Sequence, residues 1–192
     1  MTIVSVQELS KFLNKYKPTG RLADYGGTDK IGGDIVKRLI TFNESVVAGV
    51  SDQDTNSGIQ HIGFSGKGKT LKKNPPQYFA LDYDSGIDLM KPVKGQKFDV
   101  GICMDLLEHV DNPFIVANNI SDSLKKGALL FVTAPFVWQL HHYPIDCWRF
   151  CPQGLERLFS KMKSVVPIEV VRDETPGEQY KHTRVVAIFK KK

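Results

Sequence analysis

Apolar residues along this chain fall into two alternating patterns, one helical and one extended. Residues 1–18 carry apolar side chains every three or four positions, which predicts an amphipathic N-terminal helix. Beyond it, short runs of apolar and β-branched residues alternate with further stretches of helical periodicity. The runs that predict strands are residues 21–25, 45–51, 78–81, 98–104, 128–134, 165–171 and 184–189. The stretches that predict helices between them are residues 31–40, 113–124 and 152–162.

This alternation of strands and helices predicts an α/β fold. Strands joined by helices run parallel through right-handed crossovers, so we expect a seven-stranded, mostly parallel sheet with helices on both faces. The last two predicted strands follow each other without a helix, which predicts a C-terminal antiparallel hairpin. Residues 53–76 are rich in Gly, Lys, Asn and Pro and predict a long loop with room for a short hairpin. Because the sequence has no internal repeat, residues 1–192 are expected to form a single domain.

Composition narrows the class of protein. Hydrophobic residues make up 41% of the 192 positions and charged residues 24%, as in an ordinary globular domain. No apolar run reaches the roughly 18–20 residues needed to span a bilayer, and the N-terminal residues lack the pattern of a signal peptide. The three cysteines are odd in number and form no CxxC pair, which favours a reduced, cytoplasmic protein.

The formal net charge is +5, and two groups of lysines contribute much of it. They are Lys67, Lys69, Lys72 and Lys73 in the predicted long loop and Lys190, Lys191 and Lys192 at the end of the chain. Such groups could bind a nucleic acid. No aromatic residues alternate with these lysines as on a base-stacking surface, so we favour solvated lysines over a nucleic-acid partner. A membrane partner is not expected, and the sequence leaves the oligomeric state open.

Candidate ligand-binding residues follow the predicted strands, because ligands in open α/β sheets bind beyond the carboxyl ends of the strands. The first strand runs into Gly26 and Gly27, which let a backbone approach a ligand closely. Asp52 follows the second strand, and Asp82 and Asp84 follow the third. A carboxylate at the end of a second strand can accept both ribose hydroxyls of a nucleoside. The pattern therefore points to a nucleoside-containing ligand.

Three segments resemble class I S-adenosylmethionine-dependent methyltransferases. Leu22-Ala23-Asp24-Tyr25-Gly26-Gly27 is similar to the first-strand motif of that family, in which an acid precedes Gly-x-Gly, with Thr28 in place of the second glycine. The segment from Lys97 to Val110, ending in Leu-Glu-His-Val, resembles the fourth strand and the start of the next helix. The segment from His141 to Leu155 is similar to the H-x-x-P-x-D-x-W-R-F-x-P-x-G-L sequence of a subgroup that often accompanies polysaccharide biosynthesis. The resemblance implies a Rossmann-like fold.

The resemblance also implies S-adenosylmethionine as the cofactor. Asp52 is the first choice for the ribose, and Asp82 is its rival; if Asp52 binds the ribose, Asp82 or Asp84 would lie by the adenine amino group. Met104 would pack beside the cofactor, with a core position as the alternative. The residues expected to contact the cofactor are Asp24, Gly26, Gly27, Thr28, Asp52, Asp82, Asp84, Met104 and Asp105.

A second resemblance concerns a metal site. Asp105, Glu108 and His109 have the spacing of one helical face and resemble the E-x-x-E-H site of metal-dependent O-methyltransferases that act on small RNAs and ubiquinone precursors. His141, from the loop after the fifth strand, would complete the set. Such a site would hold Mg²⁺ or Mn²⁺. The alternative is that Leu-Glu-His only caps and packs the helix.

The acceptor would be handled by the segment after the fifth strand. His141 or His142 could act as the general base on a hydroxyl, since histidine titrates near neutral pH. Trp148 suits stacking on a sugar, but the alternative of a core position beneath the loop is slightly favoured, and Asp146 and Arg149 could instead pair to pin the loop. The residues expected to line the acceptor pocket are Tyr143, Asp146, Trp148 and Arg149.

The sequence therefore predicts an S-adenosylmethionine-dependent enzyme that O-methylates a hydroxylated, sugar-like small molecule or glycan. Two alternatives remain at this point. The altered glycine motif would also suit a non-catalytic, methyltransferase-like binding subunit. The acid-acid-His pattern and the lysines would suit a metal-dependent RNA 2′-O-methyltransferase.

Overall fold

The computed structural model describes residues 3–26, 30–41, 45–47, 63–65, 72–141, 145–172 and 182–192. In chain order the first elements are α1 (Ile3–Tyr16), β1 (Arg21–Tyr25), α2 (Lys30–Thr41), β2 (Ser45–Val47), β3 (Gly63–Ser65), β4 (Gln77–Leu81) and β5 (Phe98–Met104). A single 3₁₀ turn, η1 (Leu107–His109), comes next. The chain continues through α3 (Pro113–Ser123), β6 (Leu124–Val137), α4 (Pro152–Leu158), β7 (Met162–Ser164), β8 (Glu169–Arg172) and β9 (Thr183–Lys191).

The main sheet has seven strands in the order β4-β1-β5-β6-β9-β7, with β8 also paired to β9. The pairs β4–β1, β1–β5 and β5–β6 are parallel. The C-terminal strand β9 is antiparallel to β6, β7 and β8. The predicted fold class, a mostly parallel seven-stranded sheet with antiparallel C-terminal strands, is therefore confirmed.

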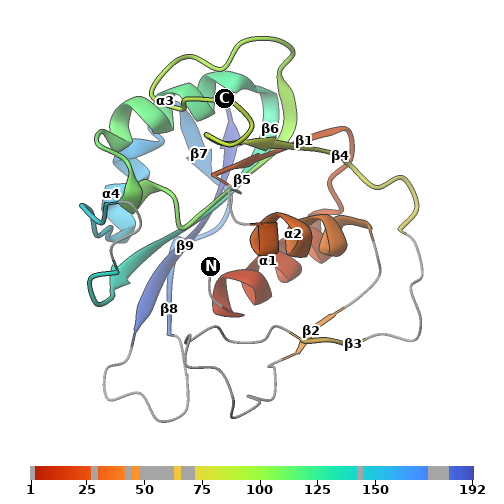
Figure 1. Cartoon of the computed structure of the whole chain (residues 1–192), viewed down its shortest axis with the longest axis horizontal. Helices are drawn as coiled ribbons and strands as arrows, with labels where there is room; N and C mark the ends of the chain where they lie inside the picture. Colours follow the sequence, from red (N-terminus) through yellow and green to blue (C-terminus); the bar gives the residue numbers. More distant parts are fainter. Residues whose placement is uncertain are drawn as a thin grey trace.

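Helices cover both faces of this sheet, with α1 and α2 on one face and α3 and α4 on the other (Figure 1). Side chains of β1 alternate between the two resulting cores. Leu22 packs with the apolar residues of α1 and α2, whereas Ala23 and Tyr25 pack with those of α3 and α4. Because both faces are covered, the parallel strands are mostly apolar, and their carboxyl ends form one edge of the sheet.

The strand β2 does not belong to the main sheet. Its residues pair antiparallel with β3 in a separate two-stranded sheet, drawn below the main sheet in Figure 1. The place beside β1 belongs to β4, with Asp24 opposite Ala80 and Tyr25 opposite Leu81. The prediction that residues 45–51 supply a strand of the main sheet is wrong for the described residues 45–47. A β-branched run signals a strand, but it does not say which strand is its neighbour.

The C-terminal elements also differ from the prediction. Residues 165–171 are predicted to form one strand, but only residues 169–171 are extended, as part of β8, and the further short strand β7 pairs with another part of β9. The helix after Pro152 ends at Leu158, and Met162 lies in β7. The nine-residue length of β9 gives room for both partners. None of the described helices is long and apolar enough to cross a membrane.

Candidate functional site

The turn after β1 brings three strand ends together. The N–H of Gly26 donates to the carbonyl of Leu81, at the end of β4, at 3.1 Å. Gly26 has φ +78°, and a Cβ at this position would lie 2.7 Å from Cδ1 of Leu106, after β5. Only glycine fits both the left-handed backbone and this contact. The predicted Gly-x-Gly-like turn therefore lies between the ends of β4 and β5, while Gly27 and Thr28 lie outside the described residues.

Asp24 is buried within β1 and is bonded across the sheet. The hydroxyl of Tyr78 in β4 donates to its Oδ2 at 2.7 Å. Burial, and then the charge and hydrogen bonding of Asp24, raise the pKa of Tyr78 far above its ordinary value, so this hydroxyl stays protonated and remains a donor. Asp24 thus fixes β4 beside β1, whatever else it does for a ligand.

Asp82 lies at the carboxyl end of β4, next to β1. Its side chain is buried, and Oδ1 accepts from the N–H of Ser85 at 2.7 Å. The Ser85 hydroxyl donates back to the Asp82 carbonyl at 2.9 Å, which closes a tight turn. Asp84 is exposed in this turn. Of the two rivals for the ribose, Asp82 follows the strand that neighbours β1, and Asp52 lies outside the described residues.

Asp105 follows β5 in a left-handed conformation, with φ +50°. Its Oδ1 accepts from Nη1 of Arg184 at 2.5 Å and from the hydroxyl of Thr133 at 3.0 Å, and its Oδ2 accepts from the hydroxyl of Ser5 at 3.2 Å. Burial favours a raised pKa, but the Arg184 charge and these hydrogen bonds lower the pKa of Asp105 below its ordinary value. Asp105 is therefore a paired carboxylate. Met104 beside it packs in the core against α1 and α2, which is the alternative expected for it.

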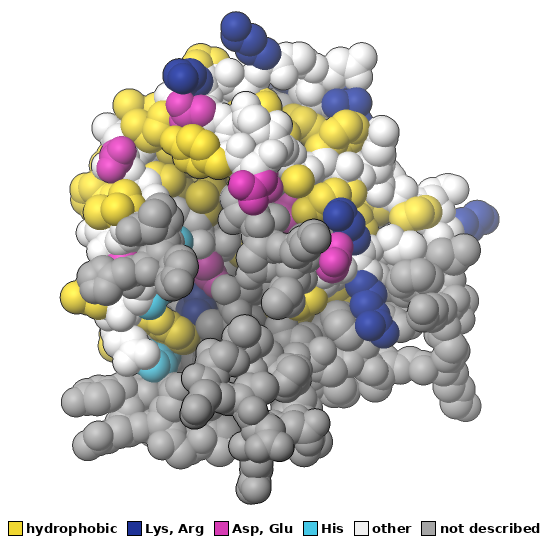
Figure 2. All heavy atoms as spheres, viewed as in Figure 1, with side chains coloured by type: hydrophobic (Ala, Val, Ile, Leu, Met, Phe, Trp, Pro, Cys, Tyr) yellow, Lys and Arg dark blue, Asp and Glu magenta, His cyan; other side chains and the backbone are white. Residues whose placement is uncertain are grey.

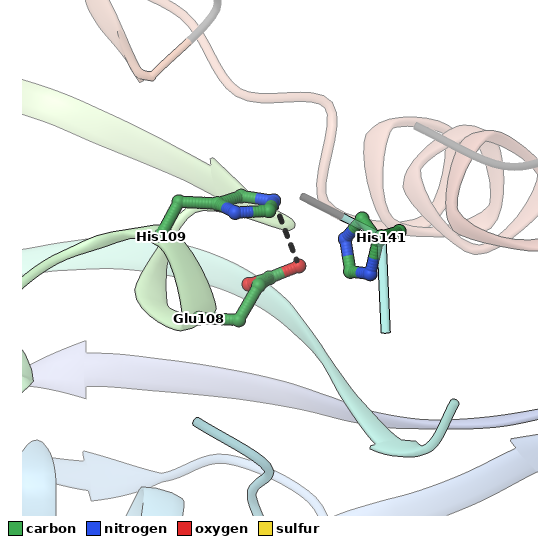
Figure 3. A group of neighbouring side chains, drawn as sticks. All are labelled: Glu108, His109 and His141. Carbon is green, nitrogen blue, oxygen red and sulfur yellow. Dashed lines mark ion pairs between the residues drawn. The ribbon is translucent and has the colours of Figure 1, made fainter. Parts of the chain in front are cut away.

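Glu108, His109 and His141 converge at the carboxyl edge of the sheet (Figure 3). One ligand-type atom from each of them lies within 4.8 Å of those of the other two. Glu108 and His109 come from η1, and His141 comes from the segment after β6. The predicted helical face of Asp105, Glu108 and His109 does not form, because only the turn Leu107–His109 is helical and Asp105 precedes it in a left-handed conformation. Asp105 is accordingly not part of this group of three.

Glu108 is the most unusual side chain of the group. It is 1% exposed, and its Oε2 has no hydrogen-bond partner among the described residues. Its Oε1 lies 3.7 Å from Nε2 of His109. Burial first, and then the Asp105 carboxylate, raise the pKa of Glu108 to about 8. A buried carboxyl group of this kind is held at a cost in free energy, which makes it a candidate for function.

Both histidines are fixed through Nδ1. Nδ1 of His109 lies 2.5 Å from the carbonyl of Ile145. Nδ1 of His141 lies 3.1 Å from Oδ2 of Asp146. The two rings meet edge to face with centroids 4.9 Å apart. Burial lowers the pKa of His141 more than the Asp146 charge raises it, so the ring is mostly neutral near pH 7.

An ion pair pins the segment that carries His141. Both Nη atoms of Arg149 donate to Asp146, at 2.5 and 2.7 Å, and Arg149 also donates to the carbonyls of Trp138 and Gln139. The Arg149 hydrogen bonds, opposed by partial burial, lower the pKa of Asp146 well below its usual range. The contacts of Asp146 and Arg149 therefore match the alternative predicted from the sequence, in which these two residues pair and hold the loop. His142 and Tyr143 lie outside the described residues.

Trp148 is anchored at one edge of its indole and is partly exposed. Its Nε1–H donates to the carbonyl of Val110 at 2.9 Å, and the residue is 39% exposed. The N–H of Cys147 donates to the carbonyl of Glu108 at 2.8 Å, so the same segment is also fixed to η1. The alternative of a core position for Trp148 does not match this exposure.

Three further residues beside the site were not singled out from the sequence. Trp138 lies between His182 and Arg184, with a ring-centroid distance of 4.0 Å to His182 and 4.4 Å from its ring centroid to the Arg184 guanidinium. The available signal was the single arginine in the otherwise apolar run of β9. A charge there must find a partner when the strand is buried, and the partner is Asp105.

Hydrophobic side chains are exposed around this edge. Figure 2 shows them on the part of one face where α3 lies, and histidine side chains reach the surface of the same face. Phe114 and Ile115 of α3 are exposed, as are three residues from the end of β6 and just beyond it. These three are Phe136, Val137 and Leu140.

Solved structures similar to this chain include S-adenosylmethionine-dependent methyltransferases. One from Methanosarcina mazei shares 12% identity over 94% of this chain and 96% of its own, with a TM-score of 0.56. The N-methyltransferase NodS of Bradyrhizobium japonicum, in complex with S-adenosylhomocysteine, shares 10% identity over 98% of this chain and 85% of its own, with a TM-score of 0.53. The Burkholderia thailandensis 1,6-didemethyltoxoflavin-N1-methyltransferase, with its substrate and S-adenosylhomocysteine bound, shares 9% identity over 97% of this chain and 78% of its own, with a TM-score of 0.58.

No protein-family model matches the sequence, and no curated protein matches it either. The three solved structures nevertheless align with this protein along nearly the whole of its chain. The protein therefore has the class I S-adenosylmethionine-dependent methyltransferase fold, as the sequence resemblance implied.

Proposed function

We propose that this protein is an S-adenosylmethionine-dependent methyltransferase that methylates a hydroxyl of a small, sugar-like acceptor in the cytoplasm. The observation that carries the proposal is the arrangement around Gly26. Its turn lies between the end of β4, where Asp82 is buried, and the segment after β5, where the Glu108 group begins. A carboxylate that could bind a nucleoside and a group suited to proton chemistry thus lie along one edge of a methyltransferase-type sheet, which supports the proposal.

For the cofactor, we propose that Asp82 binds the ribose hydroxyls. The proposal is supported by its place after the strand beside β1, where a ribose acceptor lies in dinucleotide-binding folds, and by the hydrogen bond from Ser85 that fixes its carboxylate. Gly26, with Gly27 and Thr28, would approach the methionine end, and Asp84 would lie toward the adenine. Asp24 and Asp105 would act through the protein, since one is bonded to Tyr78 and the other to Arg184.

For the acceptor, the histidines His109 and His141 favour a hydroxyl. A neutral hydroxyl must lose its proton as it attacks a methyl group, and an imidazole that is neutral near pH 7 can take that proton. The lowered pKa of His141 supports this role. Structural neighbours include N-methyltransferases, so the fold by itself does not favour oxygen over nitrogen. Methyl transfer otherwise requires mainly alignment of the acceptor with the methyl group.

Trp148 supports a sugar-like acceptor. Its indole edge is held by the Val110 carbonyl while the residue is partly exposed, and a fixed aromatic side chain can stack on the apolar face of a sugar ring. The neighbouring acid, Asp146, is occupied by Arg149, so we assign those two residues to holding the segment rather than to binding hydroxyls.

Calorimetric titration of the full chain with S-adenosylhomocysteine tests the proposal. We expect one molecule bound per chain, and no binding at about millimolar ligand would overturn the proposal. A screen of hydroxylated acceptors with isotopically labelled S-adenosylmethionine tests the transfer step. Binding without transfer to any acceptor would instead favour the non-catalytic subunit.

A further inference from the structure

We infer that Glu108, His109 and His141 form a binding site for a divalent transition-metal ion of the zinc class. Their ligand atoms lie within 4.8 Å of one another, and His141 reaches the Glu108–His109 pair from a different segment of the chain (Figure 3). Two imidazoles and one carboxylate are the ligand set of many three-ligand zinc and iron sites.

The orientation of the two histidines supports metal binding. Nδ1 of His109 faces the Ile145 carbonyl, and Nδ1 of His141 faces the Asp146 carboxylate. Both partners accept hydrogen bonds only, so each Nδ1 carries the proton and each Nε2 keeps its lone pair. Metal-ligating histidines characteristically use one ring nitrogen for the ion and donate the other N–H to a carbonyl or carboxylate. Two neighbouring histidines both show this pattern here.

The buried carboxyl group is a second, independent observation. Oε2 of Glu108 has no hydrogen-bond partner among the described residues, although the side chain is 1% exposed. The two nearby acids already have cationic partners, because Asp105 is paired with Arg184 and Asp146 with Arg149. A cation beside Glu108 would satisfy the one acid of the site that is not already in an ion pair with arginine.

The type of ion follows from the donors. Nitrogen donors from two imidazoles suit Zn²⁺ or Fe²⁺, whereas Mg²⁺ prefers an all-oxygen shell. The oxygen-rich set that would suit Mg²⁺ needed Asp105, whose carboxylate is bound by Arg184, Thr133 and Ser5. Ligand atoms about 2.0–2.2 Å from a tetrahedral ion lie roughly 3.5 Å apart. Side-chain rotations that move the ligand atoms by about 1 Å would therefore bring them within coordination distance of one ion.

A bound ion would change the role of His141. Three protein ligands leave a coordination position for an acceptor oxygen, and the ion would lower the pKa of a bound hydroxyl. His141 would then be a ligand, and the ion would replace it as the group that activates the hydroxyl. This consequence rests on the proposed methyltransferase function, whereas metal binding itself does not.

Zinc titration of the chelator-treated full-length protein, in competition with a chromophoric chelator, tests the inference. We expect one Zn²⁺ per chain and a rise in melting temperature on binding. Glu108→Gln and His141→Asn should each weaken binding by at least about tenfold. Glu108→Gln preserves side-chain size, His141→Asn puts a smaller polar side chain in place of the imidazole, and circular dichroism establishes that both variants are folded. X-ray absorption of the zinc-loaded protein should show imidazole scattering.

Cys147→Ser and Glu156→Gln are the matched controls. Cys147 is an exposed thiol close to the site in sequence, and Glu156 is an exposed acid on α4, so neither change should alter zinc affinity. Absence of stoichiometric binding at about 100 µM Zn²⁺ would overturn the inference. It would also be overturned if Glu108→Gln and His141→Asn bound zinc as tightly as the wild type. Binding of S-adenosylhomocysteine is measured without metal, so failure of one proposal is distinguishable from failure of the other.

Discussion

Gly26 and Leu106 are in contact across the carboxyl edge of the sheet, since a Cβ on Gly26 would lie 2.7 Å from Cδ1 of Leu106. This contact joins the turn after β1 to the segment that leads into η1. The proposed cofactor site and the Glu108 group therefore share a rigid boundary, and a change at Gly26 should affect both.

Gly26→Ala should destabilise the protein and weaken binding of S-adenosylhomocysteine. The left-handed backbone costs an alanine about 1–2 kcal/mol, and the clash with Leu106 adds about 1–3 kcal/mol. Gly127→Ala is the matched control, because Gly127 has φ +81° and no atom within 4 Å of its Cβ position. Urea unfolding should show the smaller loss for Gly127→Ala. Equal losses would mean that the contact with Leu106 contributes nothing.

Asp82→Asn should lower the affinity for S-adenosylhomocysteine by about tenfold or more, because a charged acceptor contributes about 1.5–3 kcal/mol to a hydrogen bond. The amide oxygen can still accept from Ser85, so the turn is expected to survive. Asp52→Asn is the decisive comparison and should leave the affinity nearly unchanged. Calorimetry on both variants measures this, and the reverse order of effects would assign the ribose to Asp52.

Arg149→Lys should loosen the segment that carries His141 without weakening cofactor binding. Lysine cannot reproduce the two parallel bonds to Asp146 together with those to the carbonyls of Trp138 and Gln139. We expect a loss of about 1–3 kcal/mol in unfolding free energy, since the partner carboxylate is buried. Hydrogen exchange should accelerate in residues 138–150, and unchanged exchange there would contradict the role of the clamp.

The contacts of Asp99 should make part of the unfolding free energy depend on pH in the acid range. It accepts from Nζ of Lys125 at 2.7 Å and from the N–H of Arg21 at 2.9 Å, and these bonds lower its pKa below the ordinary value of 3.8. A lowered pKa means that the stabilisation is present above about pH 4 and is lost as pH falls through the folded-state pKa.

The change Asp99→Asn should therefore destabilise the protein at pH 7 by no more than about 1 kcal/mol, because the pair is partly exposed. The difference from the wild type should shrink at pH 3, as measured by urea unfolding. Glu156→Gln, an exposed acid on α4, serves as the control and should show no such trend. A difference that grows toward low pH would contradict the assignment.

Local pattern was sufficient for much of the fold. The mainly apolar run of residues 98–104 became β5, and the run of residues 128–134 became the central part of β6, because parallel strands buried on both faces are mostly apolar. The N-terminal helix formed as Ile3–Tyr16 for a similar reason, since its apolar stripe fits only one face of a sheet.

The same reasoning from local pattern did not predict which strands pair with each other. Ser45–Val47 is extended as predicted, but it pairs with β3 and leaves the place beside β1 to β4. The sequence made Asp52 the first choice for the ribose and Asp82 its rival, whereas the pairing of β4 with β1 is the observation on which the proposal for Asp82 rests. Strand pairing depends on packing across the whole sheet, which no local window contains.

By itself, the sequence determined the class of fold, the glycine turn and the set of polar residues at the carboxyl edge, because these depend on periodicity and on the backbone freedom of glycine. The tertiary structure alone decided how those polar residues are used. Asp105 and Glu108 are three positions apart, yet Arg184, from 79 residues further along, binds the first and leaves the second buried beside two histidines. The physical reason is that a buried charge is governed by its neighbours in space.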